Sequence, residues 1–335
     1  MLVSELALGA MIFGESSQRS ASPQDAERMI HRFLDAGGNH IDTADVYAGG
    51  RSEEIVGKAI APRRDRVVLA SKVRFPTEEG PNAAGLARVH VLRGVENSLR
   101  RLNVETIDLL YAHAWDPLTP LEETLRAFEQ LISSGKVRYL GVSNFKAWQV
   151  MKGLAISAAH DWPPFIAAQY QYSLVVRDIE DEYQDLCLSE GLGLVPWGPL
   201  GGGFLTGKYR SGEQPQDPES GRLAVTPESY EEAWSRRATQ RNWHVLAVMD
   251  QIVAAHPGVT HSQVALAWLL SRPVVTSVII GVRTVEQLED NLGASELRLS
   301  ADELQQLDNA SQPEQGYPYR MIRSNDAARL GDLGG

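Results

Sequence analysis

The stretch RVVLASK, residues 66–72, is a short apolar run of β-strand length that ends in a lysine. Runs of this kind recur along the chain and alternate with amphipathic segments. Most are continuously apolar instead of alternating between apolar and polar residues, which is typical of parallel strands covered on both faces. The other runs are LALGAM (6–11), NHIDTA (39–44), IDLLYAH (107–113), VRYLGVSN (137–144), FIAAQYQ (165–171), LGLVPWG (192–198) and VTSVIIG (275–281).

The segments between these runs have helical periodicity. In residues 22–38 the apolar side chains fall on one helical stripe. Ser22 suits the N-cap of that helix, Pro23 its first position and Gly37 its end. Residues 284–292 open with the Thr and Gln spacing of a capping box. Further helices are predicted at 89–103, 120–136 and 178–191.

Eight strands alternating with helices allow either a closed barrel or a long doubly wound sheet. The count of eight, and a chain of 335 residues against the roughly 250 typical of barrels, favour the α/β class and a (β/α)8 TIM barrel. No linker or low-complexity stretch divides the chain, so we predict one domain over residues 1–335. Segments longer than usual connections are where we expect a site, and they cover about 73–88, 201–240 and the tail 311–335.

The composition argues against several classes of protein. A formal net charge of −11 disfavours a general nucleic-acid-binding surface, and no apolar run approaches the roughly 18 residues of a membrane span. The N-terminal stretch carries Glu5 and lacks a basic leader, so it makes a poor signal peptide. The single cysteine, Cys187, fits a reducing compartment and is predicted to be a buried small hydrophobe. We therefore expect a cytoplasmic protein that binds neither nucleic acid nor membranes.

Polar side chains stand at the carboxyl ends of the predicted strands. Asp42 lies near the end of its strand, Lys72 ends another and His113 ends a third. In a barrel these ends converge on one face, where the active sites of barrel enzymes lie. A lysine at the end of a buried strand needs a counter-charge, which Asp42 could supply. The pattern continues at Ser143, Asn144, Gln169, Trp197 and Arg283.

Tyr47 lies five residues after Asp42, in the predicted loop beyond the strand. A phenol holds its proton to about pH 10, and a nearby lysine cation lowers that pKa. Such a tyrosine can pass a proton to a carbonyl oxygen that gains negative charge, while a neutral histidine hydrogen-bonds the same oxygen. None of these groups can deliver an electron pair to carbon, so the chemistry requires a separate hydride donor. The remaining histidines form no metal-binding motif, and we predict no metal site.

Six motifs follow one another over nearly the whole chain: GGNHIDTADVYAGGRSEEIVGKAI, VVLASKV, SLRRLNVETIDLLYAH, SSGKVRYLGVSNF, WGPLGGGFLTGKY and VIIGVRTVEQLEDNL. Together they resemble the aldo-keto reductase superfamily, and most of all the branch of many bacterial reductases and the potassium-channel β subunits. The resemblance implies a barrel that binds NADPH in an extended form without a Rossmann fold. It implies that Tyr47 is the general acid and that Lys72 lowers its pKa. Asp42 would pair with Lys72, and His113 would orient the substrate.

The resemblance also implies the residues that hold the cofactor. Ser143, Asn144 and Gln169 match groups that hold the nicotinamide carboxamide, and Trp197 matches an aromatic residue that stacks on the ring. Gly198 stands where relatives often carry a serine. The resemblance implies that the adenosine 2′-phosphate binds at the start of a helix. A helix N-terminus together with an arginine suits a phosphate dianion, which favours NADP(H) over NAD(H). The other implied cofactor residues are Pro199, Leu200, Gly202, Leu205, Lys208, Gly281, Arg283, Thr284, Gln287 and Asn291.

The stretch from Gly202 to Lys208 has the GxxxxGK spacing that begins a P-loop. A P-loop needs Ser or Thr after the lysine to hold Mg²⁺, and here Tyr209 follows. The stretch also leads into a long loop instead of an obvious helix. We therefore predict that its glycines let the backbone close over a dinucleotide pyrophosphate.

The predicted function is the NADPH-dependent reduction of an aldehyde or ketone, or the reverse oxidation of an alcohol. The alternative is a regulatory or redox-sensing subunit that binds NADP(H) with little turnover. By resemblance, Trp115 shapes the substrate pocket, and Tyr317 and Tyr319 either line that pocket or anchor the tail. Ala112 and Ala114 beside the histidine make large, loosely polar substrates such as sugars or polycyclic ketones plausible. The partner is thus a small carbonyl or alcohol compound, and the oligomeric state is left open.

Overall fold

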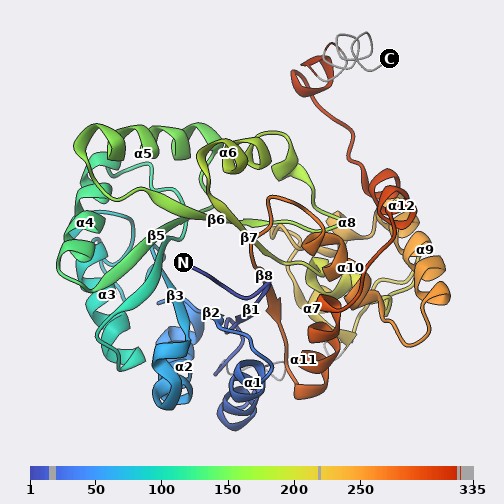
Figure 1. Ribbon diagram of the computed structural model, residues 1–335, viewed down its shortest axis with the longest axis horizontal. Helices are drawn as coiled ribbons and strands as arrows, with labels where there is room; N and C mark the ends of the chain where they lie inside the picture. Colours follow the sequence, from blue (N-terminus) through green and yellow to red (C-terminus); the bar gives the residue numbers. More distant parts are fainter. Residues whose placement is uncertain (15–19, 218–219, 323–324, 326–335) are drawn as a thin grey trace.

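Eight parallel strands form the centre of the molecule in the residues that the computed structural model describes, which are 1–14, 20–217, 220–322 and 325. Their hydrogen-bonded order is β7-β6-β5-β4-β3-β2-β1-β8. The backbone of Leu194 also bonds the chain just before β8, which brings β7 to β8 and closes the ring (Figure 1). The strands are β1 (Leu6–Gly9), β2 (His40–Asp42), β3 (Val68–Val73), β4 (Ile107–Ala112), β5 (Val137–Ser143), β6 (Phe165–Gln171), β7 (Gly193–Trp197) and β8 (Val278–Gly281).

Helices surround this ring of strands, and the predicted (β/α)8 barrel is confirmed (Figure 1). Every apolar run predicted to be a strand contains one. The helices are α1 (Pro23–Asp35), α2 (Arg51–Ile60), α3 (Arg88–Leu102), α4 (Leu121–Ser133), α5 (Ala147–His160), α6 (Tyr183–Glu190), α7 (Arg222–Val225), α8 (Trp234–Arg237), α9 (Gln240–Ala255), α10 (His261–Leu270), α11 (Val285–Leu292) and α12 (Ala301–Ser311).

Local sequence explains where most of these helices begin and end. The Ser22 hydroxyl caps α1 by accepting a hydrogen bond from the Asp25 backbone at 3.1 Å, and Gly37 follows the helix with a φ of 89°. The prediction for residues 178–191 is only half right. Its first part is a 3₁₀ turn, Asp178–Glu180, where Glu180 accepts hydrogen bonds from the Arg177 guanidinium, and α6 starts only at Tyr183.

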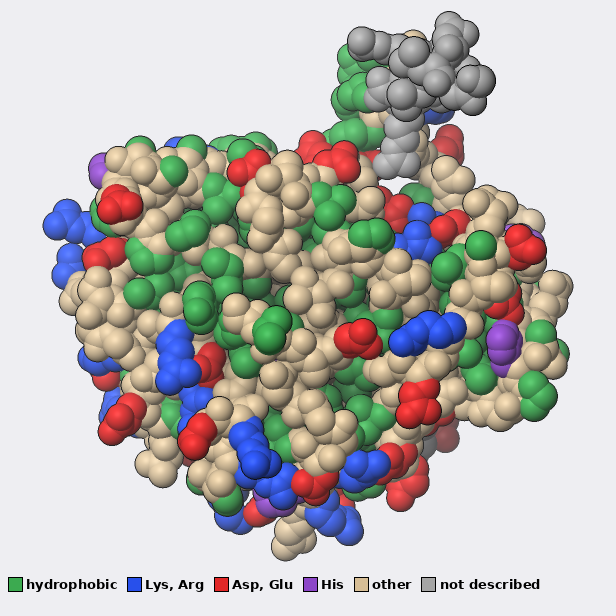
Figure 2. Space-filling model, viewed as in Figure 1, with side chains coloured by type: hydrophobic (Ala, Val, Ile, Leu, Met, Phe, Trp, Pro, Cys, Tyr) green, Lys and Arg blue, Asp and Glu red, His purple; other side chains and the backbone are tan. Residues whose placement is uncertain are grey.

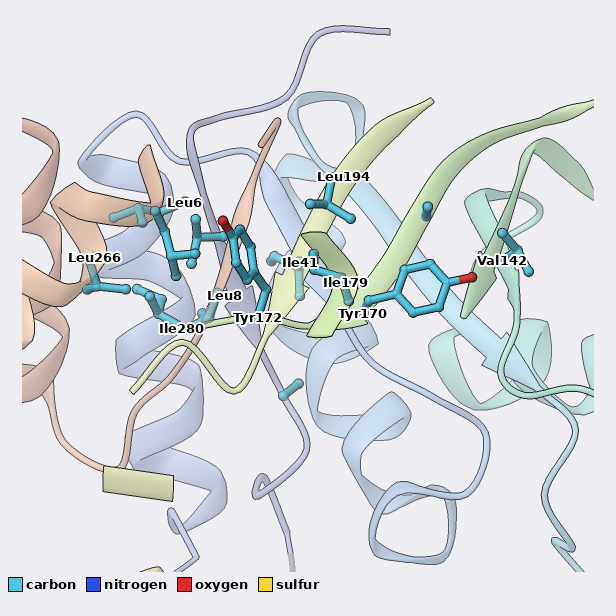
Figure 3. Packing of buried hydrophobic residues seen from close by; sticks show 14 of the residues in the cluster. Leu6, Leu8, Ile41, Val142, Tyr170, Tyr172, Ile179, Leu194, Leu266 and Ile280 are labelled. Atoms are coloured by element: carbon cyan, nitrogen blue, oxygen red, sulfur yellow. The ribbon is translucent and has the colours of Figure 1, made fainter. Parts of the chain in front are cut away.

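The sheet is buried on both of its faces, one toward the helices and one toward the inside of the ring. The outward-facing side chains pack against the helices, and Figure 3 shows Leu8 of β1 beside Ile280 of β8 and close to Leu266 of α10. The alternate side chains form separate clusters inside the ring, one around Ala7 and Ile279 and another of Ala70, Leu109, Tyr111 and Ala167. Because side chains alternate along a strand, residues two positions after these interior ones also face the ring interior.

The long segments are held by specific contacts. The Asp116 carboxylate accepts a hydrogen bond from the Leu86 backbone at 2.7 Å, which ties residues 73–88 to the loop after β4. Past α12 the chain runs outward (Figure 1), and the Tyr319 hydroxyl donates to Glu182 at 2.6 Å while Tyr317 is exposed. Tyr319 therefore anchors the tail. The rest of the tail, 323–324 and 326–335, lies outside the described residues.

The surface carries both signs of charge. Acidic and basic side chains are intermingled over the face that Figure 2 shows. Among the described residues, no helix is both long enough and apolar enough to cross a bilayer.

Candidate functional site

The strand pattern brings three of the predicted site residues into one buried cluster. Asp42 and Lys72 project from β2 and β3, and Tyr47 begins a 3₁₀ turn, Tyr47–Gly50, just beyond β2. The Lys72 ammonium donates to the Asp42 carboxylate at 2.5 Å, to the Thr43 carbonyl at 2.8 Å and to the Tyr47 hydroxyl at 3.2 Å. These contacts satisfy a cation whose side chain has no exposed surface.

Lys72 is charged in this setting. Burial by itself lowers the pKa of Lys72, but Asp42 and Tyr47 outweigh burial and the net pKa lies above the usual lysine value. The ammonium also lies over the Tyr47 ring, 4.7 Å from its centroid.

The pKa of Tyr47 differs in direction from the sequence prediction. Burial raises it, Lys72 lowers it and Asp42 raises it again, and the net pKa lies above 10.0. Lys72 has the predicted effect, yet the expected net lowering is wrong, because desolvation of the phenolate is the larger influence. The phenol accordingly holds its proton at neutral pH.

His113 stands at the end of β4, two residues after the interior Tyr111. Its ring contacts Tyr47 edge-on, with 5.9 Å between centroids. Burial, followed by the charges of Lys72 and Arg74, holds the pKa of His113 well below 6.5, so the imidazole is neutral. Its Nδ1 atom is buried and makes no hydrogen bond within the described residues.

Two residues next to the site were missed in the sequence reading. The Phe75 ring lies 4.7 Å from the His113 ring, and the Arg74 guanidinium lies 5.1 Å from the centre of the Phe75 ring. Both follow directly on β3, so their position just past a strand end was the available signal. Trp115, the predicted substrate residue, contacts Phe145 at 5.1 Å between centroids. The Trp148 ring lies 6.2 Å from the Trp115 ring between centroids, and Trp148 is 58% exposed.

The three residues expected to hold the carboxamide are joined to the same cluster. The Gln169 amide donates to the second oxygen of Asp42 at 2.8 Å, and the Ser143 hydroxyl donates to the Gln169 carbonyl at 2.8 Å. The Asn144 amide donates to the His113 carbonyl and to Ser143, both at 2.9 Å. The network links β2, β4, β5 and β6 through side chains from one end of the ring.

The glycine segment, which we define as residues 198–207, follows β7 and the half-buried Trp197. Gly198, Gly201, Gly202, Gly203 and Gly207 all have positive φ values between 57° and 91°, and such a backbone strongly favours glycine. A Cβ atom at these positions would also meet neighbouring side chains, at 2.7 Å from Val175 for Gly201 and at 3.0 Å from Leu223 for Gly202. Two members of the segment are buried, Pro199 and Leu205, and Leu205 has no exposed surface at all.

The start of α11 gathers the last predicted cofactor residues beyond the exposed Gly281. Thr284 caps the helix by accepting a hydrogen bond from the Gln287 backbone at 3.3 Å. The predicted capping box is incomplete, because the Gln287 side chain accepts from the Arg283 backbone at 2.9 Å instead of from Thr284. Arg283 is partly exposed beside this N-terminus, whereas Asn291 is only 4% exposed.

The chain matches known proteins over most of its length. The family model described as "Aldo/keto reductase family" matches residues 5–312. A protein of Oryza sativa subsp. japonica named "Probable voltage-gated potassium channel subunit beta" is 36% identical over 297 residues, covering 87% of each chain. "Norsolorinic acid reductase" of Aspergillus flavus is 34% identical over 340 residues, covering 96% of this chain and 81% of the relative. "Uncharacterized oxidoreductase YrpG" of Bacillus subtilis is 36% identical over 319 residues, covering 92% of both.

Proposed function

The chain belongs to the aldo/keto reductase family, and we propose that it uses NADP(H) to interconvert an aldehyde or ketone and an alcohol. The observation that carries the proposal is the contact between Lys72 and Tyr47 at 3.2 Å, at the end of the barrel where the glycine segment and α11 also lie. Bound NADPH would supply the hydride that the side chains cannot provide.

Tyr47 would donate the proton in carbonyl reduction. Its pKa above 10.0 keeps the phenol protonated at neutral pH, so the proton is available when the carbonyl oxygen gains negative charge. As the proton leaves, Lys72 faces the resulting phenolate and stabilises it electrostatically. Asp42 keeps Lys72 charged and in place, since its carboxylate accepts a hydrogen bond from the ammonium at 2.5 Å. The other carboxylate oxygen accepts a hydrogen bond from the Gln169 amide.

His113 would orient the carbonyl. A neutral imidazole can donate one hydrogen bond without competing for the proton that Tyr47 delivers, and the low pKa of His113 keeps it neutral. The rings of Phe75 and Trp115 would form an apolar wall for the rest of the substrate.

The residues present fit a dinucleotide. The glycine segment would pass close to the pyrophosphate, because its five glycines leave the backbone without side chains at those positions. Arg283 and the N-terminus of α11 would hold the 2′-phosphate, which favours NADP(H) over NAD(H). Trp197 would stack on the nicotinamide, with Ser143, Asn144 and Gln169 at its carboxamide.

The test compares Tyr47→Phe with Tyr319→Phe, which removes a hydroxyl that only anchors the tail. Tyr47→Phe should lower turnover of NADPH with a carbonyl panel by about 10² to 10⁴-fold, the usual contribution of general acid catalysis. NADPH binding, followed by fluorescence titration, should change little in either variant. Wild-type turnover in Tyr47→Phe would contradict the proposal.

The names of the potassium-channel relatives favour one second candidate, a regulatory subunit that retains NADP(H) with little turnover. Stopped-flow absorbance of bound NADPH mixed with aldehydes, ketones and sugars separates the two. Oxidation of the bound cofactor within seconds supports the reductase, and a flat trace with every carbonyl supports the regulatory subunit.

A further inference from the structure

A buried carboxylate lies against the glycine segment. Glu232, just before α8, is 5% exposed. Its Oε1 atom lies 3.5 Å from the position that a Cβ atom on Gly198 would take, and 3.7 Å from the corresponding position on Gly202. Both glycines belong to the stretch that, under the proposed function, passes close to the cofactor pyrophosphate. A carboxylate of the protein therefore lies against the glycines that are proposed to approach the phosphate groups.

The Glu232 carboxylate also forms an ion pair with Arg222. Its Oε2 atom contacts the Arg222 guanidinium at 2.5 Å. The Arg222 side chain is 44% exposed and lies close enough to the site for its charge to lower the pKa of Tyr47. Guanidinium groups bind carboxylates and phosphates with the same geometry, so Arg222 suits either partner.

A second arginine lies beneath the segment. Arg237 is 4% exposed, and its Cδ atom lies 3.9 Å from the Cβ position on Gly201. Its Nε and Nη2 atoms are buried and have no hydrogen-bond partner within the described residues. Burial lowers the pKa of Arg237, and Glu232 is the largest influence that raises it. Removing the carboxylate would leave a buried cation with unfilled donors under the glycine segment, which is costly unless another anion arrives.

We propose that Glu232 is an internal anion that occupies the phosphate-binding position of the glycine segment, and that the cofactor must displace it to bind. The inference rests on the proposed function for the identity of the ligand. Displacement would release Arg222 and leave Arg237 facing the incoming phosphate groups. Glu232 thus stabilises the protein without cofactor and, by thermodynamic linkage, weakens the binding of the cofactor.

The experiment compares Glu232→Gln with Glu231→Gln, a neighbouring glutamate whose side chain is 74% exposed. Dissociation constants are measured by fluorescence titration for NADPH, and by calorimetry for inorganic pyrophosphate. We expect Glu232→Gln to bind both probes about tenfold more tightly than wild type, within the usual range of coupling between sites. Its melting temperature without ligand should fall, and Glu231→Gln should match wild type in every measurement.

A structural role for Glu232 predicts the opposite result. If the carboxylate only shaped the loop, Glu232→Gln would bind NADPH and pyrophosphate equally or more weakly, and either outcome overturns the inference. A conservative variant, Glu232→Asp, covers the case in which the amide variant does not fold. It shortens the reach to the glycines and should tighten pyrophosphate binding, while unchanged or weaker binding counts against the inference. Failure of wild type to bind NADPH would overturn the proposed function alone, because the pyrophosphate comparison still tests the internal anion.

Discussion

Asp45, two residues before Tyr47, should make the protein less stable as the pH rises. Its side chain is 1% exposed, and neither carboxylate oxygen has a hydrogen-bond partner within the described residues. Its neighbour Glu53 is fully buried but accepts hydrogen bonds from Ser71 at 2.6 Å and Arg101 at 2.7 Å. Burial, and then the charge of Glu53, raises the pKa of Asp45 from 3.8 to about 8.

The magnitude follows from this shift. Between pH 4 and pH 8 the native protein keeps the Asp45 proton, whereas the unfolded chain releases it. The unfolded state then binds fewer protons, so the free energy of unfolding falls by about 1.4 kcal/mol per pH unit from this group. The amide side chain of the Asp45→Asn variant cannot titrate. The stability of that variant relative to wild type should therefore increase by about 2.7 kcal/mol between pH 5 and pH 7 and level off above pH 8.

Calorimetric melting at pH 5, 6 and 7 measures this slope. With an unfolding entropy of about 2.1 cal/mol/K per residue over 335 residues, each kcal/mol shifts Tm by roughly 1.4 °C. The Tm of Asp45→Asn minus the Tm of wild type should increase by about 4 °C from pH 5 to pH 7. Any constant effect of the amide cancels in this slope. Asp65→Asn removes an exposed carboxylate and should give a flat difference. A flat difference for Asp45→Asn as well would show that Asp45 is ionised in the native protein.

Two further variants test the packing around this carboxyl cluster. Gly57→Ala should lower the free energy of unfolding by about 1–3 kcal/mol, because its Cβ would overlap the Leu102 carbonyl at the end of α3; a urea midpoint at or above that of wild type would contradict this. Arg101→Met should cost about 3–5 kcal/mol, because it leaves the buried Glu53 unpaired. Adding Glu53→Gln should recover much of that loss in urea unfolding, and no recovery would show that the ion pair is not the cause.

The sequence predicted the barrel well because each strand is a short apolar run. Strand-end positions also located Asp42, Lys72 and His113, since alternation and the barrel's geometry send such residues to one place. The predicted direction of the shift in the Tyr47 pKa was wrong, because the cost of burying a phenolate depends on neighbours that the sequence does not reveal.

The remaining misses have the same origin. Glu232 lies 34 residues beyond Gly198 in the sequence, inside a long loop that carries no periodic pattern to place it. Asp45 has the same residue type and nearly the same sequence position as Asp42, yet Asp42 has a cation beside it and Asp45 has no hydrogen-bond partner within the described residues. The two carboxylates differ because Asp42 contacts Lys72 of β3, whereas Asp45 lies near the buried Glu53 of α2.

The adjacency of β1 and β8 has a consequence for how the protein is made. Leu6 of β1 pairs with Val278 of β8, so one edge of β1 has no hydrogen-bonding partner strand until β8 has been synthesised. Contacts this distant in sequence form slowly, and the partly synthesised chain exposes an edge that can pair with other chains. Chains that stop before β8 should therefore be aggregation-prone clients of molecular chaperones, even though they already carry Asp42, Tyr47, Lys72 and His113.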